Sequence, residues 1–404
     1  MQKQDQRDLK RGKAGILFVT SSLDVGGTER HLASICGILR ARGWDLEVYC
    51  TGGEGPFAEV LRRDSVKVMM PPGAARYRAG GVLGALRLPL AALHLFGVLV
   101  KGRFAIVHCF LPGAYLIGAP LAFLVRTRLL VMSRRSLNDY QRNHPLGGGA
   151  ERRLHPLMSA VLANSRSVAK QLEGEGVDAS RIGLIYNGVA DTGPVVTDRA
   201  QARSSLGIDE GALVLVVIAN LIAYKGHLDL IEALGRIKNQ MPASWRLLAV
   251  GRDDGLGADI RSRAEAVGLD AQISLLGVRS DIPDLLTASD IAILASHQEG
   301  FSNAVIEGMQ AGLPMIVTNV GGNAEAVVDG ETGLVVAPHD PEALAAAILR
   351  LASDAELRRR YGAAGRRRVA AHFSLETCVA AYEALYGGLL AGKTPAEIAQ
   401  VRYQ

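Results

Sequence analysis

The chain has 404 residues, of which 49% are hydrophobic and 21% are charged. This composition excludes a disordered protein, and the length exceeds what one hydrophobic core usually holds, so we expect two domains. The four cysteines form no CxxC pair, which excludes a disulfide framework and a zinc knuckle and is typical of a reducing compartment. Residues 1–13 are too polar for a secretory signal. We therefore expect a cytoplasmic protein.

The net charge of +5 is the sum of the opposite net charges of two halves of the chain. Residues 1–190 hold 26 Lys and Arg against 14 Asp and Glu, a net charge of +12, and the remaining residues hold 19 against 26, a net charge of −7. This split suggests two domains with different partners. The basic half could face an anionic membrane, an anionic acceptor or nucleic acid, unless it is merely an Arg-rich surface.

In the first half, apolar runs rich in Val, Ile and Leu alternate with amphipathic segments. The runs predict buried parallel strands, because such strands lack polar alternation. We expect strands at 15–20, 46–50, 66–70, 106–109, 129–132, 160–163 and 182–185, with helices such as 28–42 and 165–175 between them. The apolar stretch 82–100 is interrupted by Arg87, Pro89 and His94, so we expect a buried or surface-lying helix, and membrane contact that is at most peripheral.

Residues 191–211 break this rhythm with Gly, Pro and polar residues and predict an interdomain linker. The alternation then restarts, with strands expected at 213–219, 246–250, 273–276, 291–294, 315–317 and 333–336 and closing helices at 341–351, 356–371 and 375–390. Two series of this kind predict an α/β protein with two doubly wound parallel sheets. In such folds a ligand binds beyond the carboxyl ends of the strands.

The strongest functional signal is the segment 299–307, EGFSNAVIE, which lies between a predicted strand and a predicted helix. Ser302 or Asn303 can cap that helix. The backbone N–H groups of its first turn, with the positive end of the helix dipole, form an anion site that suits a diphosphate without a metal ion. Glu299 and Glu307 flank this site, and sugar or ribose hydroxyls would be suitable hydrogen-bond donors to them.

A second signal is the segment 220–227, NLIAYKGH, which follows the first strand of the second half. Lys225 is expected at a strand-to-helix turn, where its ammonium group can reach a phosphate at the sheet edge. Gly226 allows a tight turn there.

These motifs, in this order, resemble the retaining GT-B glycosyltransferases of family 4. The resemblance also includes Leu276-Gly277 before Asp281-Ile282, Gly312-Leu313-Pro314, the segment 24–30 (DVGGTER) and Asn187-Gly188-Val189. It implies two Rossmann-like domains that face each other across a cleft: an acceptor-binding domain at 1–190, a nucleotide-sugar-binding domain at 191–374, and a helical segment at 375–404 that crosses back to the first. The expected substrates are a nucleotide diphosphate sugar, with UDP favoured, and a glycan or lipid-linked acceptor.

The resemblance also implies roles for individual residues. Lys225 would neutralise the leaving diphosphate, and Glu299 would contact the donor sugar hydroxyls. Glu307 would bind the ribose. The other implied donor-binding residues are Gly26, Gly27, Asn220, Gly277, Val278, Gly300, Phe301, Ser302, Asn303 and Ala304. No cofactor and no metal ion would be needed.

Two positions depart from the family pattern. An Arg usually lies five residues before the Lys, where this chain has Asn220, and Arg252 or a basic residue of the first half could replace its charge. A His is usual after the fifth strand, where this chain reads Ser133-Arg134-Arg135-Ser136. Arg134 or Arg135 could face a phosphate there, or both could be surface arginines. His108 could line the acceptor cleft, or be a core histidine.

Several other classes of function find little support. The nine histidines show no HxxxH or HExxH spacing, so we expect no metal site. The arginine runs 358–360 and 366–368 predict a solvated helix face and no nucleic-acid site. Three alternatives remain: a GT-B nucleotide-sugar epimerase, a polymerising glycosyltransferase, and a non-catalytic binding protein of the same fold.

Overall fold

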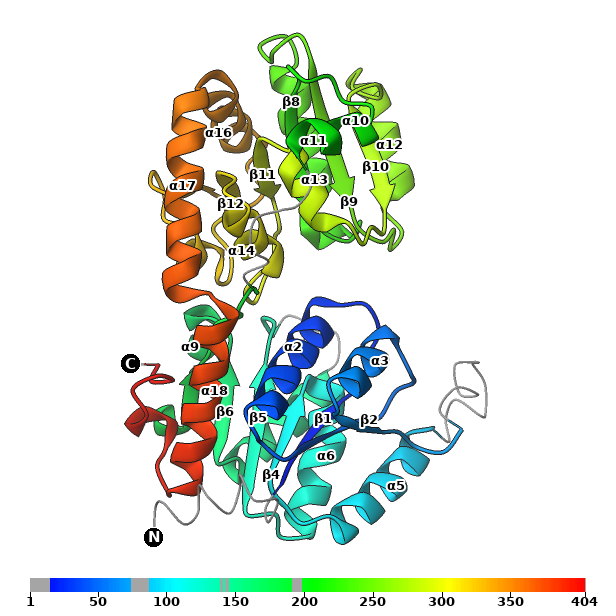
Figure 1. Cartoon of the computed structure of the whole chain (residues 1–404), viewed down its shortest axis with the longest axis vertical. Helices are drawn as coiled ribbons and strands as arrows, with labels where there is room; N and C mark the ends of the chain where they lie inside the picture. Colours follow the sequence, from blue (N-terminus) through cyan, green and yellow to red (C-terminus); the bar gives the residue numbers. More distant parts are fainter. Residues whose placement is uncertain (1–14, 74–86, 139–140, 142–144, 191–197, 404) are drawn as a thin grey trace. The chain divides into compact units, whose positions relative to one another are not determined.

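The computed structural model describes residues 15–73, 87–138, 141, 145–190 and 198–403. The chain divides into two compact units, which are Met1–Gly188 with Leu375–Gln404 (unit 1) and Val189–Ser374 (unit 2) (Figure 1). Residues 82–86 of the apolar stretch and residues 191–197 of the expected linker lie outside the described residues.

Unit 1 contains a seven-stranded parallel sheet in the order β3-β2-β1-β4-β5-β6-β7. Its strands are β1 (Gly15–Thr20), β2 (Leu46–Cys50), β3 (Lys67–Met69), β4 (Phe104–Phe110), β5 (Leu129–Arg134), β6 (Ala160–Ala163) and β7 (Ile182–Leu184). Its helices are α2 (Gly27–Ala41), α3 (Pro56–Arg63), α5 (Arg87–Lys101), α6 (Pro112–Leu124), α8 (Pro145–Leu154), α9 (Arg166–Gly174) and α18 (Leu375–Leu390).

Unit 2 contains a six-stranded parallel sheet in the order β10-β9-β8-β11-β12-β13. Its strands are β8 (Leu213–Ile218), β9 (Trp245–Val250), β10 (Ile273–Gly277), β11 (Ile291–Leu294), β12 (Met315–Thr318) and β13 (Gly333–Val336). Its helices are α10 (Arg199–Ser205), the short η4 (Ala223–Lys225), α11 (His227–Ile237), α12 (Gly257–Ala266), α13 (Ile282–Ala288), α14 (Asn303–Gln310), α15 (Asn323–Ala326), α16 (Pro341–Ser353) and α17 (Ala355–His372).

The expected α/β fold with two parallel sheets is confirmed. Every expected strand is present, with ends that differ by at most two residues from the predicted ones. All six residues of β1 are buried, and five of the six in β8. Burial on both faces is the reason why these strands read as continuous apolar runs.

Each sheet has a point at which the strand order reverses, between β1 and β4 in unit 1 and between β8 and β11 in unit 2. At such a point the loops that leave two neighbouring strands turn to opposite faces of the sheet, and the crevice between them is the usual ligand site of the fold. The loops after β8 and β11 carry the two strongest sequence motifs.

The chain returns to unit 1 at its C-terminal helix. Helix α18 packs against α2, and its Tyr382 and Tyr386 belong to the same buried cluster as Phe18. The rings of Trp44 and Tyr386 lie 5.8 Å apart, and the Trp44 indole donates a 2.8 Å hydrogen bond to Glu383. Helix α17 instead packs against α14 of unit 2. In the described part of the chain, we find no helix with the length and apolarity needed to cross a membrane.

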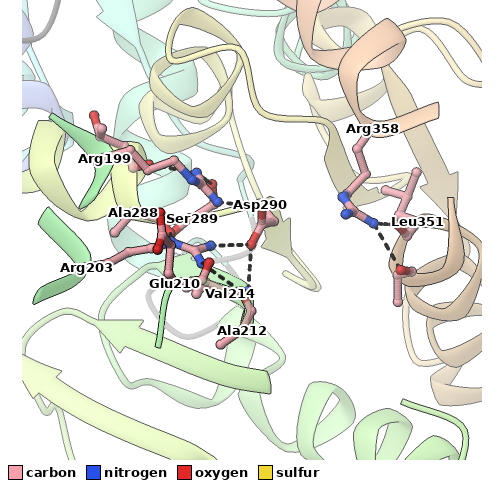
Figure 2. Close-up of polar contacts among 12 residues, drawn as sticks. Arg199, Arg203, Glu210, Ala212, Val214, Ala288, Ser289, Asp290, Leu351 and Arg358 are labelled. Atoms are coloured by element: carbon pink, nitrogen blue, oxygen red, sulfur yellow. Dashed lines mark hydrogen bonds and ion pairs between the residues drawn. The ribbon is translucent and has the colours of Figure 1, made fainter. Parts of the chain in front are cut away.

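Arginines hold the amino-terminal edge of the unit 2 sheet (Figure 2). Asp290, just before β11, accepts from Arg199, Arg203 and the Val214 backbone N–H at 2.6, 2.8 and 2.8 Å. Arg203 is almost fully buried and also donates to the carbonyl oxygens of Ala288, Asp209, Glu210 and Ala212. This single guanidinium therefore ties α10 to the strand that leads to the EGFSNAVIE segment.

We predict that Arg203→Met destabilises unit 2 by about 3–5 kcal/mol, because it removes one member of a buried ion pair and leaves several carbonyl groups without a donor. Arg236→Met is the matched control. Arg236 is half exposed and forms an i,i+4 pair with Glu232, worth at most about 1 kcal/mol. Urea unfolding of both variants measures the difference, and equal losses would contradict the structural role of Arg203.

Candidate active site

The reversal of strand order in unit 2 brings the two sequence motifs together. Lys225 lies at the end of η4, in the connection from β8 to α11, and Glu299 lies in the connection from β11 to α14. The Lys225 ammonium donates to Glu299 Oε1 at 2.6 Å. The Ser296 hydroxyl donates to the same oxygen at 2.7 Å. Both charged side chains are mostly buried, with 17% and 9% of their surface exposed, so the pair is held in a defined geometry.

Gly226 explains how the two loops come so close. Its φ is +70°, in the left-handed region, and a Cβ atom at this position would lie 1.9 Å from the Ala295 carbonyl oxygen. Only glycine satisfies both conditions without displacing the backbone. In the Lys-Gly sequence, the glycine is therefore required for the contact between the two loops, and the lysine supplies the charge.

The loop after β12 supports Glu299 from its other side. The Gly322 N–H donates to the Gly300 carbonyl oxygen at 2.8 Å, and the Thr318 hydroxyl donates to the Ser296 carbonyl oxygen at 2.5 Å. At Gly321, with φ of +52°, a Cβ atom would lie 1.8 Å from the Glu299 carbonyl oxygen. Three adjacent strands thus supply the loops that fix one carboxylate.

Helix α14 begins directly after this loop. Ser302 is its N-cap residue in an extended conformation, but its side chain makes no capping hydrogen bond. Asn303 and Ala304 form the first turn and are partly buried, as is Glu307 one turn later. The Phe301 side chain is buried and packs 5.2 Å from the Phe373 ring. This arrangement turns the amino-terminal end of α14, with its positive dipole end, toward the carboxyl edge of the sheet.

Asn220 and Arg252 are neighbours in the structure. The Asn220 side-chain oxygen accepts from the Arg252 backbone N–H at 3.2 Å, and the Asn220 amide donates to Asp254 at 3.1 Å. The Arg252 side chain forms an exposed 2.6 Å pair with Asp254. His227 also holds this loop, because its Nε2 donates to the Asn220 carbonyl oxygen at 3.0 Å and burial lowers its pKa.

Gly277 and Val278 lie at the end of the edge strand β10 and are exposed. The Gly277 carbonyl oxygen accepts from the Gly251 N–H at 2.9 Å. These two residues thus share the carboxyl edge of the sheet with Lys225 and Glu299, two strands away from β8.

Gly26 and Gly27 belong to unit 1, where they begin helix α2 after β1, at the reversal point of that sheet. The side chain of Glu29 lies so close that a Cβ atom on Gly26 would be 2.3 Å from it. Burial raises the pKa of Glu29.

Arg134 and Arg135 are both buried, so the interpretation of them as surface arginines is wrong. Arg134 is 1% exposed and pairs with Glu151 at 2.8 Å and with Glu175 at 3.0 Å. Its charge is already matched by two buried carboxylates, which accounts for its burial. Arg135 is also buried and donates to the Asn187 side chain at 2.5 Å.

His108 is a core residue of β4 and does not line a cleft. It is fully buried, its Nδ1 lies 2.8 Å from the Tyr386 hydroxyl, and its Nε2 lies 2.8 Å from the Ser133 hydroxyl. Burial and the charge of Arg135 hold its pKa well below its usual value. The imidazole is therefore neutral and joins β4, β5 and α18.

The structure also gathers residues that sequence spacing did not reveal. Asp229, His297 and His339 are far apart in the chain but meet in unit 2. Asp229 follows Lys225 by four residues, and His297 precedes Glu299 by two. Ser296 was likewise not expected to share Glu299 Oε1 with Lys225. The signal for Ser296 was its position three residues before Glu299, which becomes meaningful only when the loop conformation is known.

Two family models match the chain. Residues 25–192 match the model described as Glycosyltransferase Family 4, and residues 198–368 match the model described as Glycosyl transferases group 1. N-acetyl-alpha-D-glucosaminyl L-malate synthase of Bacillus anthracis is 30% identical over 52% of this chain and 54% of that protein. D-inositol 3-phosphate glycosyltransferase of Rhodococcus erythropolis is 33% identical over 46% of this chain and 44% of that protein. The chain thus spans about half the length of the curated relatives it matches.

Solved structures resemble the whole fold. HepE of Anabaena in complex with UDP-glucose has a TM-score of 0.78 at 25% identity, covering 91% of this chain and 97% of that one. WaaG, a glycosyltransferase involved in lipopolysaccharide biosynthesis, has a TM-score of 0.70 at 18% identity, covering 90% and 98%.

We predict that the buried ion pairs of Arg134 with Glu151 and Glu175 make a contribution to stability that is lost in acid. Burial acts to raise the pKa of Glu175, but hydrogen bonds from His155 and Arg134 outweigh it and hold the pKa below its usual range. The stabilisation is therefore present near neutral pH and is lost as the pH falls below about 5. Glu175→Gln should lower stability at pH 7 by about 3 kcal/mol and flatten the acid dependence of unfolding.

The exposed neighbour Glu173 provides the control. Glu173→Gln should keep the wild-type acid dependence in denaturant unfolding between pH 7 and about pH 2. If the two variants behave alike, Glu175 does not stabilise the buried arginine.

Proposed function

Because the chain belongs to glycosyltransferase family 4, we propose that it transfers a sugar, with retention, from a nucleotide diphosphate donor to an acceptor hydroxyl. The observation that carries the proposal is the Lys225–Glu299 pair beside the start of α14, at the reversal point of the unit 2 sheet. The crystal structures of HepE with UDP and UDP-glucose support a UDP-sugar as the donor.

In this proposal the diphosphate binds where backbone amides and an ammonium converge. The first-turn amides of α14 supply hydrogen bonds to phosphate oxygens. Lys225, anchored in the facing loop, supplies the positive charge that stabilises the departing diphosphate. This preorganisation has a physical advantage, because both groups are held by packed loops and need little rearrangement during the reaction.

Glu299 is proposed to position the donor sugar. Its Oε1 already accepts from Lys225 and Ser296, so the carboxylate is held in a fixed orientation. A sugar hydroxyl can donate to its remaining lone pairs. In the proposed reaction this carboxylate orients the sugar, and the transfer takes place on the same face without a covalent intermediate.

Arg252 is proposed to supply the charge that Asn220 lacks. The two residues are in contact through the Arg252 backbone N–H. The pair with Asp254 is exposed, so its exchange for a phosphate costs at most about 1 kcal/mol. A guanidinium can then form a charge-assisted, bidentate contact with the diphosphate.

We predict that Lys225→Ala and Glu307→Gln weaken ligand binding in different ways. Lys225→Ala should weaken both UDP and inorganic pyrophosphate, because it removes a charge from the diphosphate site. Glu307→Gln should weaken UDP alone, because its proposed partner is the ribose. In a UDP-glucose hydrolysis assay Lys225→Ala should lower turnover about 10²-fold or more, which corresponds to about 2–4 kcal/mol.

Calorimetry with the two ligands measures these differences. Lys238→Ala is the matched control, since Lys238 is an exposed lysine of unit 2 that donates to the Val267 carbonyl oxygen. Near wild-type turnover and affinity in Lys225→Ala would refute the site.

A thermal-shift screen with UDP-, GDP- and ADP-sugars identifies the donor base, since a ligand of the native state raises the melting temperature.

We further propose that unit 1 binds the acceptor and contacts an anionic membrane surface, as expected for a lipid-linked glycan intermediate. Helices α5 and α6 pack together and expose large apolar side chains, namely Leu88, Leu90, Leu93 and Val100 on α5 and Phe123 and Leu124 on α6. The exposed Lys101 and Arg126 follow directly at the ends of these helices. Apolar side chains bordered by basic ones are typical of peripheral membrane contact.

We predict that Leu93→Glu reduces sedimentation of the protein with vesicles rich in anionic lipid. Leu93 is 69% exposed, so the variant should fold normally. Val60→Glu, an exposed apolar position on α3, should sediment as the wild type does. Wild-type binding that depends neither on the anionic lipid fraction nor on salt would contradict the proposal.

A further inference from the structure

Three side chains from separate parts of unit 2 form a compact cluster outside the proposed donor site. Asp229 lies in the first turn of α11, His297 in the loop after β11, and His339 between β13 and α16. The distance from Asp229 Oδ2 to His297 Nε2 is 2.8 Å and that to His339 Nδ1 is 4.0 Å. The two imidazole rings lie 3.7 Å apart. We call these three residues the Asp-His-His cluster.

These distances are close to those of a metal site. The donor atoms of the three residues all lie within 4.8 Å of one another. Ligand atoms around a tetrahedral ion at about 2.0–2.1 Å are separated by about 3.4 Å. Two imidazoles on one tetrahedral ion have ring centres about 5 Å apart, so the His339 ring has to turn away from the His297 ring by more than about 1 Å before all three atoms reach one ion. His339 is 67% exposed, so its ring can make this movement.

The backbone supports the cluster on each side. The His297 N–H donates to the Tyr224 carbonyl oxygen at 2.7 Å, which fixes the histidine to the loop of Lys225. His339 has a φ of +59°, a left-handed conformation that non-glycine residues seldom adopt. Asp229 is fixed in the helix that follows Gly226. The three side chains thus extend from fixed backbone positions, and the exposed His339 ring leaves one side open to solvent.

We propose that Asp229, His297 and His339 bind one divalent transition-metal ion, of which Zn²⁺ is the best match. Two imidazoles with one carboxylate are a common donor set for Zn²⁺. Mg²⁺ and Ca²⁺ are poor matches because they require oxygen ligands. Three protein ligands leave a fourth position for water.

The ion would connect the first turn of α11, the loop of Glu299 and the connection before α16. It stabilises unit 2 by binding the native state, and its coordination does not involve the diphosphate. The inference is independent of the proposed transfer reaction, so each can fail without the other.

The test uses the full chain, stripped of metal with a chelator and titrated with Zn²⁺ by calorimetry, with Mg²⁺ as the comparison ion. We expect one Zn²⁺ per chain, a rise in melting temperature with Zn²⁺ and none with Mg²⁺. His339→Ala and Asp229→Asn should each weaken Zn²⁺ binding at least tenfold. His372→Ala, which removes an exposed histidine of α17, should bind as the wild type does.

A second measurement guards against effects on folding. Co²⁺ in place of Zn²⁺ should give visible absorption that His339→Ala abolishes and His372→Ala retains. Zn²⁺ binding that is unchanged in His339→Ala, or a wild-type chain that binds Zn²⁺ no more tightly than Mg²⁺, overturns the proposal.

Discussion

The close approach of two loops at Gly226 is the constraint on which the candidate site depends. There the chain after β8 passes so near the Ala295 carbonyl oxygen that no side chain fits. This contact exists because β8 and β11 are neighbours in the sheet although two strand–helix units separate them in sequence. It brings the backbone of the loop that carries Lys225 close to the backbone of the loop that carries Glu299. The two side chains can therefore form their 2.6 Å ion pair.

The pair also shows how the chain manages a cluster of charge at a sheet edge. A carboxylate next to an anion site is unfavourable unless it has partners. Here the ammonium of Lys225 and the hydroxyl of Ser296 both donate to one oxygen of Glu299. Gly321 and Gly322, which follow β12, contact the backbone at Glu299 and Gly300. The carboxylate thus has its own donors, while the neighbouring amides at the start of α14 remain suited to a phosphate.

Most of the fold could be predicted from the sequence, because buried parallel strands leave continuous apolar runs and the helices between them show clear periodicity. The meeting of Lys225 and Glu299 could be expected for the same reason, since both follow strands whose carboxyl ends share an edge. Buried charges were harder to predict. Arg134 looked available for a ligand because its partners are distant in the chain. Glu151 lies in α8 and Glu175 directly follows α9, and the sequence does not show that they pack against Arg134.

Contacts between residues far apart in the chain were equally hidden. The sequence offers no metal-binding spacing around His297, and only the fold brings it within 2.8 Å of Asp229. His108 shows the opposite case. A histidine on an apolar strand can be interpreted as a core residue from the sequence alone, and the structure adds its hydrogen-bond partners Ser133 and Tyr386.

The return of α18 to unit 1 has a consequence for how the protein is made. Residues 189–374 are inserted between two parts of the same unit, so ribosomes must synthesise all of them before α18 can cover its surface on α2. At translation rates of about 5–20 residues per second this takes roughly 10–40 seconds. During that interval the apolar residues of unit 1 that pack against Tyr382 and Tyr386, Trp44 among them, lack this cover.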